Sequence, residues 1–124
     1  MAEIIKMKKD CALDDMQLEQ LAEDLRYGLS PEFICGETVC GGSAVLLSFE
    51  RYFMRNGNYA ALTVLLSREM DSTGAVVIGS AGGGGLLNLS WGANRSFAED
   101  AERILLQSGF EPVPCEEEHE EFDD

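Results

Sequence analysis

The clearest pattern of apolar and polar residues lies near the start of the chain. Apolar side chains recur there every three to five positions, the period of an amphipathic helix: Leu13, Met16, Leu21, Leu25 and Leu29, with Leu18 and Ala22 widening the stripe. Asp14 and Asp15 place negative charge in the first turn, and Gly28 and Pro31 mark the end. We therefore predict a helix over Leu13–Gly28.

The middle of the chain changes to the two-residue period of β-strands. In Ser43–Met54 one parity carries Val45, Leu47, Phe49 and Phe53. The sequence Asn-Gly-Asn at 56–58 tolerates positive φ and predicts a hairpin turn, after which Tyr59–Ser67 returns as the next strand. Further strands are predicted over Ala75–Ala81 and Leu86–Trp91, with an edge strand over Glu32–Thr38. The short segment Ala2–Met7 is either a first strand or an ordered arm.

A second helix is predicted near the end of the chain. Ser96 has the chemistry of an N-cap, and Glu99 stands three residues later, which is the spacing of a capping box. Its apolar face comprises Phe97, Ala101, Ile104 and Leu105, and Gly109 ends it. A helix, several sequential strands and a helix predict an α+β fold. We expect one domain over residues 1–111, an antiparallel meander sheet of four to five strands with two helices packed on one face.

The predicted strands are apolar on both parities. The second parity of Ser43–Met54 carries Ala44, Leu46, Tyr52 and Met54. A sheet with one solvated face alternates more cleanly than this. Either both faces are covered within the monomer, or one face meets a partner, and a homodimer is the natural way to cover the excess.

Charge narrows the range of partners. The 124 residues include 23 acidic and 9 basic side chains, a net charge of −14, and seven of the acidic residues lie between Glu116 and Asp124. We therefore predict that residues 112–124 form a disordered acidic tail, which begins at Pro112. A field of this sign argues against binding nucleic acid or anionic membranes. No export signal or membrane-spanning run is visible, so we predict a cytoplasmic protein.

The stretch from Gly41 to Leu106 resembles a known family. The resemblance rests on Glu50-Arg51-Tyr52, the turn Asn56-Gly57-Asn58, the segment Ser80–Gly83 and the closing helix. The family is one of small, uncharacterised bacterial proteins, a domain of unknown function. The resemblance implies a compact α+β fold and a bacterial cytosolic origin. It transfers no catalytic residue, because the family has no assigned activity.

Two other features suggest a functional site, but a plainer structural interpretation is favoured for each. The run Gly82–Gly85 suggests a phosphate loop, but no Lys follows it and the next residues look extended, so a turn or bulge is favoured. Four cysteines and one histidine suggest a zinc site: Cys11, Cys35, Cys40, Cys115 and His119. Their spacing is loose, and free thiols are favoured. We expect no metal and no cofactor.

The remaining candidate site lies at the end of the first long strand. Glu50 and Tyr52 share one parity and line a shallow pocket if Arg68 or Trp91 joins them. A cross-strand ion pair between Glu50 and Arg68 is the plainer interpretation. His119 lies in the acidic tail, which argues against a histidine-based triad.

These observations favour a non-catalytic binding or protein-interaction module that associates with itself. The motivation is excess apolar surface in a chain that shows no catalytic motif. The alternative is a small ligand-binding protein or enzyme with a shallow pocket around Glu50, Tyr52 and Trp91.

Overall fold

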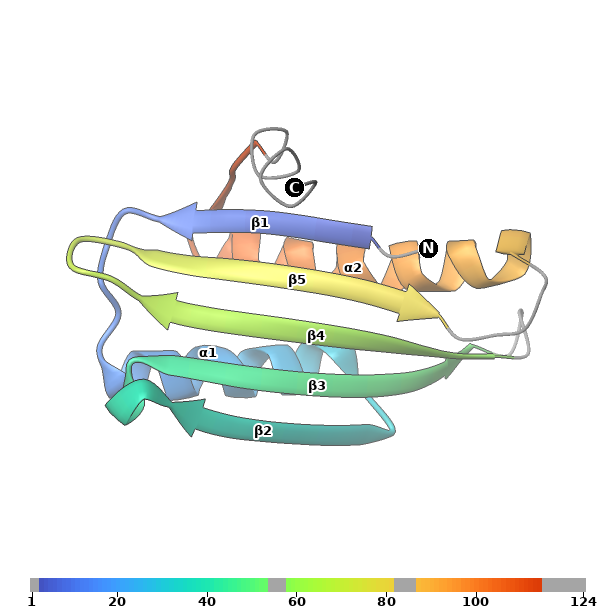
Figure 1. Cartoon of the computed structure of the whole chain (residues 1–124), viewed down its shortest axis with the longest axis horizontal. Helices are drawn as coiled ribbons and strands as arrows, with labels where there is room; N and C mark the ends of the chain where they lie inside the picture. Colours follow the sequence, from blue (N-terminus) through green and yellow to red (C-terminus); the bar gives the residue numbers. More distant parts are fainter. Residues whose placement is uncertain (1–2, 54–57, 82–86, 115–124) are drawn as a thin grey trace, which may run out of the picture.

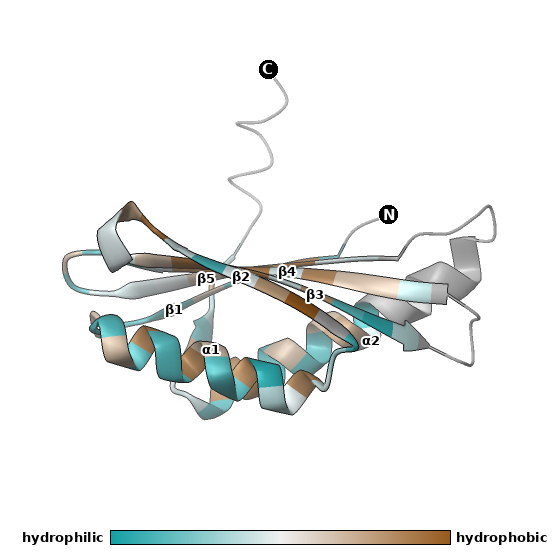
Figure 2. Cartoon of the chain, turned by 90° about the horizontal axis from the view of Figure 1, so that it is seen from below, coloured by the Kyte–Doolittle hydropathy of each residue, from teal (hydrophilic) through white to brown (hydrophobic). Residues whose placement is uncertain are grey.

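The computed structural model describes residues 3–53, 58–81 and 87–114. It has two layers, an antiparallel sheet of six strands and two helices on one of its faces (Figures 1 and 2). The α+β prediction is confirmed, with six strands instead of four to five. The elements are β1 (Glu3–Lys9), α1 (Asp15–Leu29), β2 (Phe33–Val39), η1 (a 3-10 turn, Cys40–Gly42), β3 (Ala44–Phe53), β4 (Asn58–Arg68), β5 (Thr73–Ala81), α2 (Leu87–Gln107) and β6 (Glu111–Pro112).

The strand order is β2-β3-β4-β5-β1-β6. Strands β2 to β5 form the predicted meander, and the turn between β3 and β4 falls at residues 54–57, outside the described residues. The N-terminal segment is a strand of the sheet, because β1 pairs with β5 in the register Ile5↔Val77. Since β1 and β2 lie far apart in this order, the intervening helix α1 carries the chain across the sheet (Figure 1).

Ordered structure continues beyond Pro112, where we predicted the tail to begin. Glu111 lies opposite Lys8 in the pairing of β6 with β1. The backbone N–H of Val113 donates to the carbonyl of Lys6 at 2.9 Å. The most acidic part of the tail, residues 115–124, lies outside the described residues.

Helix α1 confirms the first helix that the sequence pattern predicted. The carboxylate of Asp14 accepts from the backbone N–H of Gln17 at 2.8 Å, and the Gln17 side chain accepts from the Asp14 N–H at 2.9 Å, so Asp14 is the N-cap of a complete capping box. The buried stripe is Leu18, Leu21, Leu25 and Leu29. A Cβ added at Gly28 would clash with Cδ1 of Ile104, so glycine permits the close approach of α1 to α2.

Helix α2 corrects two predictions. The strand predicted over Leu86–Trp91 is wrong, because residues 87–107 form one continuous helix. For the same reason Ser96 is inside the helix and is not its N-cap. A short run of leucines is ambiguous between strand and helix, and propagation from an established helix adds residues at little cost. The predicted end is confirmed: Gly109 has a φ of 96°, and the Phe110 N–H donates to the Leu105 carbonyl at 3.0 Å.

The core lies between the sheet and the helices. Alternate residues of each central strand point to the helices and are buried: Val45, Leu47 and Phe49 of β3, Leu62, Val64 and Leu66 of β4, and Ala75 and Val77 of β5. They pack against the apolar stripes of α1 and α2, including Phe97 and Leu105. Full burial of each large apolar side chain contributes about 1.5–3 kcal/mol.

Polar contacts fix the connection between β1 and α1. The buried hydroxyl of Thr73 accepts from the N–H of Leu13 at 3.0 Å and donates to the carbonyl of Cys11 at 2.9 Å. The guanidinium of Arg68 donates to the Leu13 carbonyl at 2.8 Å and forms an ion pair with Asp15 at 2.9 Å. These bonds hold the start of α1 against the β4–β5 hairpin.

Candidate functional site

The sheet has one face that the helices do not cover. Both helices lie on the same side in Figure 2, and Figure 1 looks onto the other side. Within the described part of the chain, no helix or strand packs over this second side, which we call the open face. The 3-10 turn η1 rises beside its edge on the same side (Figure 2). The sequence left open whether both faces of the sheet are covered within the monomer. Among the described residues, helices cover one face and not the other.

The open face carries large apolar side chains. Seven of them keep between 36% and 46% of their surface exposed: Ile4, Val39, Leu46, Tyr52, Tyr59, Leu65 and Ile78. They come from β1, β2, β3, β4 and β5, so they extend across the sheet. Single exposed apolar residues are ordinary, but a set gathered on one face makes that face a candidate binding surface.

One cross-strand row defines the centre of the open face. Strand register places five residues side by side in the order Lys6, Val76, Leu65, Leu46 and Glu37. We call this set the central row. Its three inner members are apolar, its β1 end is basic and its β2 end is acidic. Neighbouring strands lie about 4.8 Å apart, so the row spans about 19 Å from Lys6 to Glu37.

Aromatic and acidic side chains gather at one end of β3 and β4. The rings of Tyr52 and Tyr59 meet edge to face, with centroids 5.1 Å apart. The Tyr59 hydroxyl lies 3.5 Å from Oε1 of Glu32. The pKa of Tyr59 is raised above its ordinary value of 10.0, first by partial desolvation of the phenol and then by the negative charges of Glu32 and Glu50.

The four predicted site residues do not all come together. Glu50 and Tyr52 lie on the open face, as alternation along β3 predicted. Arg68 points to the helix layer, where it contacts Leu13 and Asp15. The cross-strand ion pair of Glu50 with Arg68 is therefore wrong: Glu50 lies opposite Ala61, seven positions from Arg68 along β4. Trp91 belongs to α2 and not to a strand beside Tyr52.

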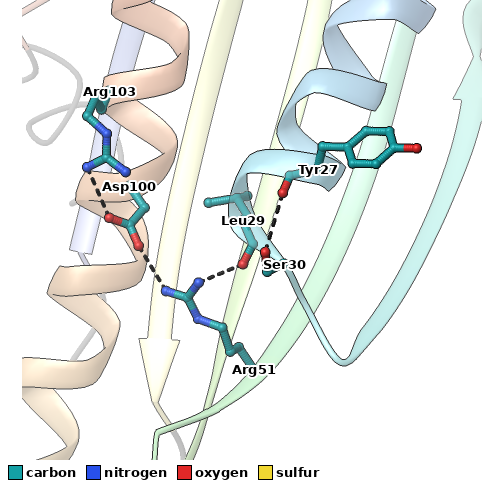
Figure 3. A network of polar contacts seen from close by, with 6 residues as sticks. All are labelled: Tyr27, Leu29, Ser30, Arg51, Asp100 and Arg103. Atoms are coloured by element: carbon teal, nitrogen blue, oxygen red, sulfur yellow. Dashed lines mark hydrogen bonds and ion pairs between the residues drawn. The ribbon is translucent and has the colours of Figure 1, made fainter.

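The main polar network of the helix-covered face centres on Arg51 and was not predicted from the sequence (Figure 3). Its guanidinium donates to the Leu29 carbonyl at 2.6 Å and to Asp100 at 2.9 Å, and it lies 4.5 Å from the centroid of the Phe97 ring. Asp100 also pairs with Arg103 at 3.2 Å. Arg51 thus joins the end of α1 to α2. The sequence signal for this role was the position of Arg51 on the parity opposite to Glu50, which directs its side chain to the other face of the sheet.

The surface hollows of the described residues include two beside the sheet. One, of about 450 Å³, lies between the end of α1 and β2 and is lined by Glu23, Arg26, Tyr27, Ser30, Pro31, Glu32 and Ile34. The other, of about 410 Å³, lies over β4, β5 and β1, where Gly74 contributes no side chain; Lys6, Lys8, Leu65, Ser67, Glu69 and Val113 are among the residues around it. The second hollow belongs to the open face.

The thiols show no metal-binding arrangement in the described ranges. Cys11, Cys35 and Cys40 are free and exposed. No three His, Cys, Asp or Glu residues among those the structure describes are placed to hold a metal ion. Cys115 and His119, and the glycine run Gly82–Gly85, lie outside the described residues. Neither helix of the described chain is long and apolar enough to span a bilayer.

Comparison with known proteins gives a family and no activity. Residues 31–109 match the model of a family of unknown function, DUF6054, which confirms the resemblance seen in the sequence. No curated protein matches. A crystal structure of an uncharacterised protein from Bacillus thuringiensis has 10% sequence identity and a TM-score of 0.40, covering 87% of this chain and 98% of that one.

Proposed function

The chain belongs to DUF6054, a family of unknown function, and we propose that it is a non-catalytic binding module of the bacterial cytoplasm. Its binding surface is the open face, and its partner is another protein surface. The observation that carries the proposal is the set of seven large apolar side chains that stay 36–46% exposed on the open face. Removing such a surface from water is favourable at about 25 cal/mol for each Å² of apolar area.

The chemistry of the open face supports a protein partner. Apolar side chains at its centre and charged ones at its edges reproduce the usual anatomy of a protein interface, a hydrophobic core with a polar rim. Tyr52 and Tyr59 add the residue type that carries much of the energy in such interfaces. The apolar side chains of the open face extend over five strands, a breadth that suits a protein surface.

Site-specific photo-crosslinking in cells tests this function. A photoreactive amino acid replaces Leu46 on the open face and, in a matched control, Leu106 on α2. The two leucines are 43% and 48% exposed, so they differ in location and hardly in accessibility. We expect discrete crosslinked products from position 46 and none from position 106. Equal products from both positions, or none from position 46, would refute the proposal.

A second candidate function is a small-ligand site around Glu50 and Tyr52, without Trp91, which lies in α2. The observation that favours it is the Tyr52–Tyr59 ring pair beside Glu32, which presents aromatic faces and negative charge together. Native mass spectrometry of the purified full chain tests it. A reproducible added mass that disappears in Glu50→Gln and persists in Glu37→Gln would support the site, and its persistence in both variants would exclude it.

A further inference from the structure

We infer that the partner of the open face is a second copy of the same chain. The two sheets pack face to face about a two-fold axis that runs along β4. This inference rests on the proposed function and names its partner.

The central row is complementary to itself. It has Lys6 at one end, Glu37 at the other, and Leu65 of β4 in the middle. A two-fold axis along β4 lays the row of one protomer over the reversed row of its partner. Each Lys6 then faces a Glu37, each Val76 faces a Leu46, and the two Leu65 side chains meet on the axis. Every charged end meets its opposite, and every apolar member meets an apolar one.

The charges select this axis over its alternative. A two-fold axis perpendicular to the strands would place β1 on β1 and β2 on β2. Lys6 would then lie near a second Lys6 and Glu37 near a second Glu37, an arrangement that like-charge repulsion disfavours. The Debye length is about 8 Å at physiological salt, so the net charge of the chains is screened while the close Lys6–Glu37 contacts are not.

The distances are compatible with both contacts. Facing sheets pack about 10 Å apart, a gap that the side chains of Lys and Glu bridge from opposite sides. Aligned sheets cross at about 30°, which displaces the ends of the central row by about 5 Å along the strands, within the reach of the flexible Lys stem.

The area of the open face approaches that of a stable dimer interface. Five strands about 4.8 Å apart and eight residues of about 3.3 Å each give a flat face of about 630 Å². The side chains make the accessible area larger than this projection, which brings it close to the roughly 800 Å² that each partner buries in a standard interface.

The edge of the open face is also complementary in shape to the hollow over Gly74 of a second copy. The turn η1 (Cys40–Gly42) rises beside β2 at the end where β3 begins (Figure 2). Across the sheet at the same end lies the hollow over Gly74, of about 410 Å³. The register runs Lys8, Gly74, Ser67, Ala44 and Val39 across this end. The two-fold axis therefore brings η1 of each protomer to the hollow of its partner.

A charge-reversal experiment on the full chain tests the inference. Lys6→Glu and Glu37→Lys each replace two attractive contacts in the dimer by two repulsive ones, so each variant alone should dimerise at least about tenfold more weakly than the wild type. Mixed in equal amounts, the two variants restore opposite charges at both contacts and should form a heterodimer. Sedimentation velocity measures the affinities. Uniform isotope labelling of one variant lets native mass spectrometry identify the heterodimer.

Controls separate this result from general effects of charge. Glu19→Lys makes the same change as Glu37→Lys on the exposed side of α1 and should dimerise like the wild type. Circular dichroism verifies the fold of each variant. A wild-type chain that stays monomeric, single variants that dimerise normally, or a mixture without preference for the heterodimer would overturn the inference. If Leu46 nevertheless crosslinks to a different protein, the proposed function stands and only the second copy is refuted.

Discussion

Leu65 and Leu66 are consecutive residues of β4 with opposite environments. Leu66 is fully buried between the sheet and the helices, whereas Leu65 stays 36% exposed on the open face. The same contrast holds for Arg51 and Glu50 on β3: the guanidinium of Arg51 contacts both helices, while the Glu50 carboxylate points away from them. Each strand thus builds two surfaces at once, one that holds the domain together and one that no helix covers.

The contrast between the two faces separates the requirements of folding from those of a candidate binding surface. On the covered face, side-chain volume and polar pairing are constrained by close packing on all sides. On the open face, neither constraint applies within one chain, and yet large apolar residues persist. Substitutions on the two faces should therefore affect different measurements, the free energy of unfolding for the covered face and association for the open face.

The largest expected effect is on the leucine pair itself. Leu66→Ala leaves a cavity in the core and should lower the free energy of unfolding by about 2–5 kcal/mol. Leu65→Ala removes a partly exposed side chain and should change it by less than about 1 kcal/mol. Urea denaturation at low protein concentration measures both, since association then contributes least to stability. Equal losses in the two variants would mean that the open face is structural.

An intermediate effect is expected for the neighbouring charges on β3. Arg51→Ala leaves the Leu29 carbonyl without its donor, separates Asp100 from one of its two cations and removes the contact with Phe97. Loss of bonds of this kind should cost about 1–3 kcal/mol in the free energy of unfolding. Glu50→Ala, on the exposed side, should cost less than about 0.5 kcal/mol. Thermal denaturation of the two variants in parallel compares them, and a smaller loss for Arg51→Ala would contradict the network as drawn in Figure 3.

Local patterns in the sequence predicted the elements that local chemistry fixes. The stripe from Leu18 to Leu29 and the acidic residues at its start are enough to define α1, because capping and periodicity act within a few residues. The parity of β3 likewise separated Glu50 from Arg51 correctly. The excess of apolar residues on both parities of the strands was the one sign in the sequence that pointed to the open face.

The features that escaped prediction depend on contacts between distant residues. Whether residues 3–9 form a strand is decided by β5, about seventy positions later, in the pairing Ile5↔Val77. Arg68 is held by Leu13 and Asp15 from another element, so its strand position alone suggested the wrong partner. The central row is assembled from five strands and has no trace in any single segment. Only the register reveals that its two ends carry opposite charges.

The smallest expected effect concerns Tyr59 at the aromatic end of the open face. Its pKa is raised by partial desolvation and by the nearby charges of Glu32 and Glu50. In the unfolded chain this phenol loses its proton at lower pH than in the folded one. Above pH 10.0 the folded state therefore holds more protons than the unfolded state does. The contribution of Tyr59 to the free energy of unfolding is complete below that pH and is lost as pH rises through the folded pKa.

Two substitutions examine this end of the face. In an ultraviolet titration of phenolate absorbance, Tyr59→Phe should remove a step that lies above the ordinary tyrosine range. Glu32→Gln should keep that step and move it toward lower pH, because the carboxylate charge that opposes ionisation is gone while an acceptor oxygen remains. A step unmoved by Glu32→Gln would mean that Glu32 contributes little and that desolvation is the dominant cause of the raised pKa. Tyr59 would then be more enclosed than a side chain on an uncovered sheet face, as a partner chain seated on that face would make it.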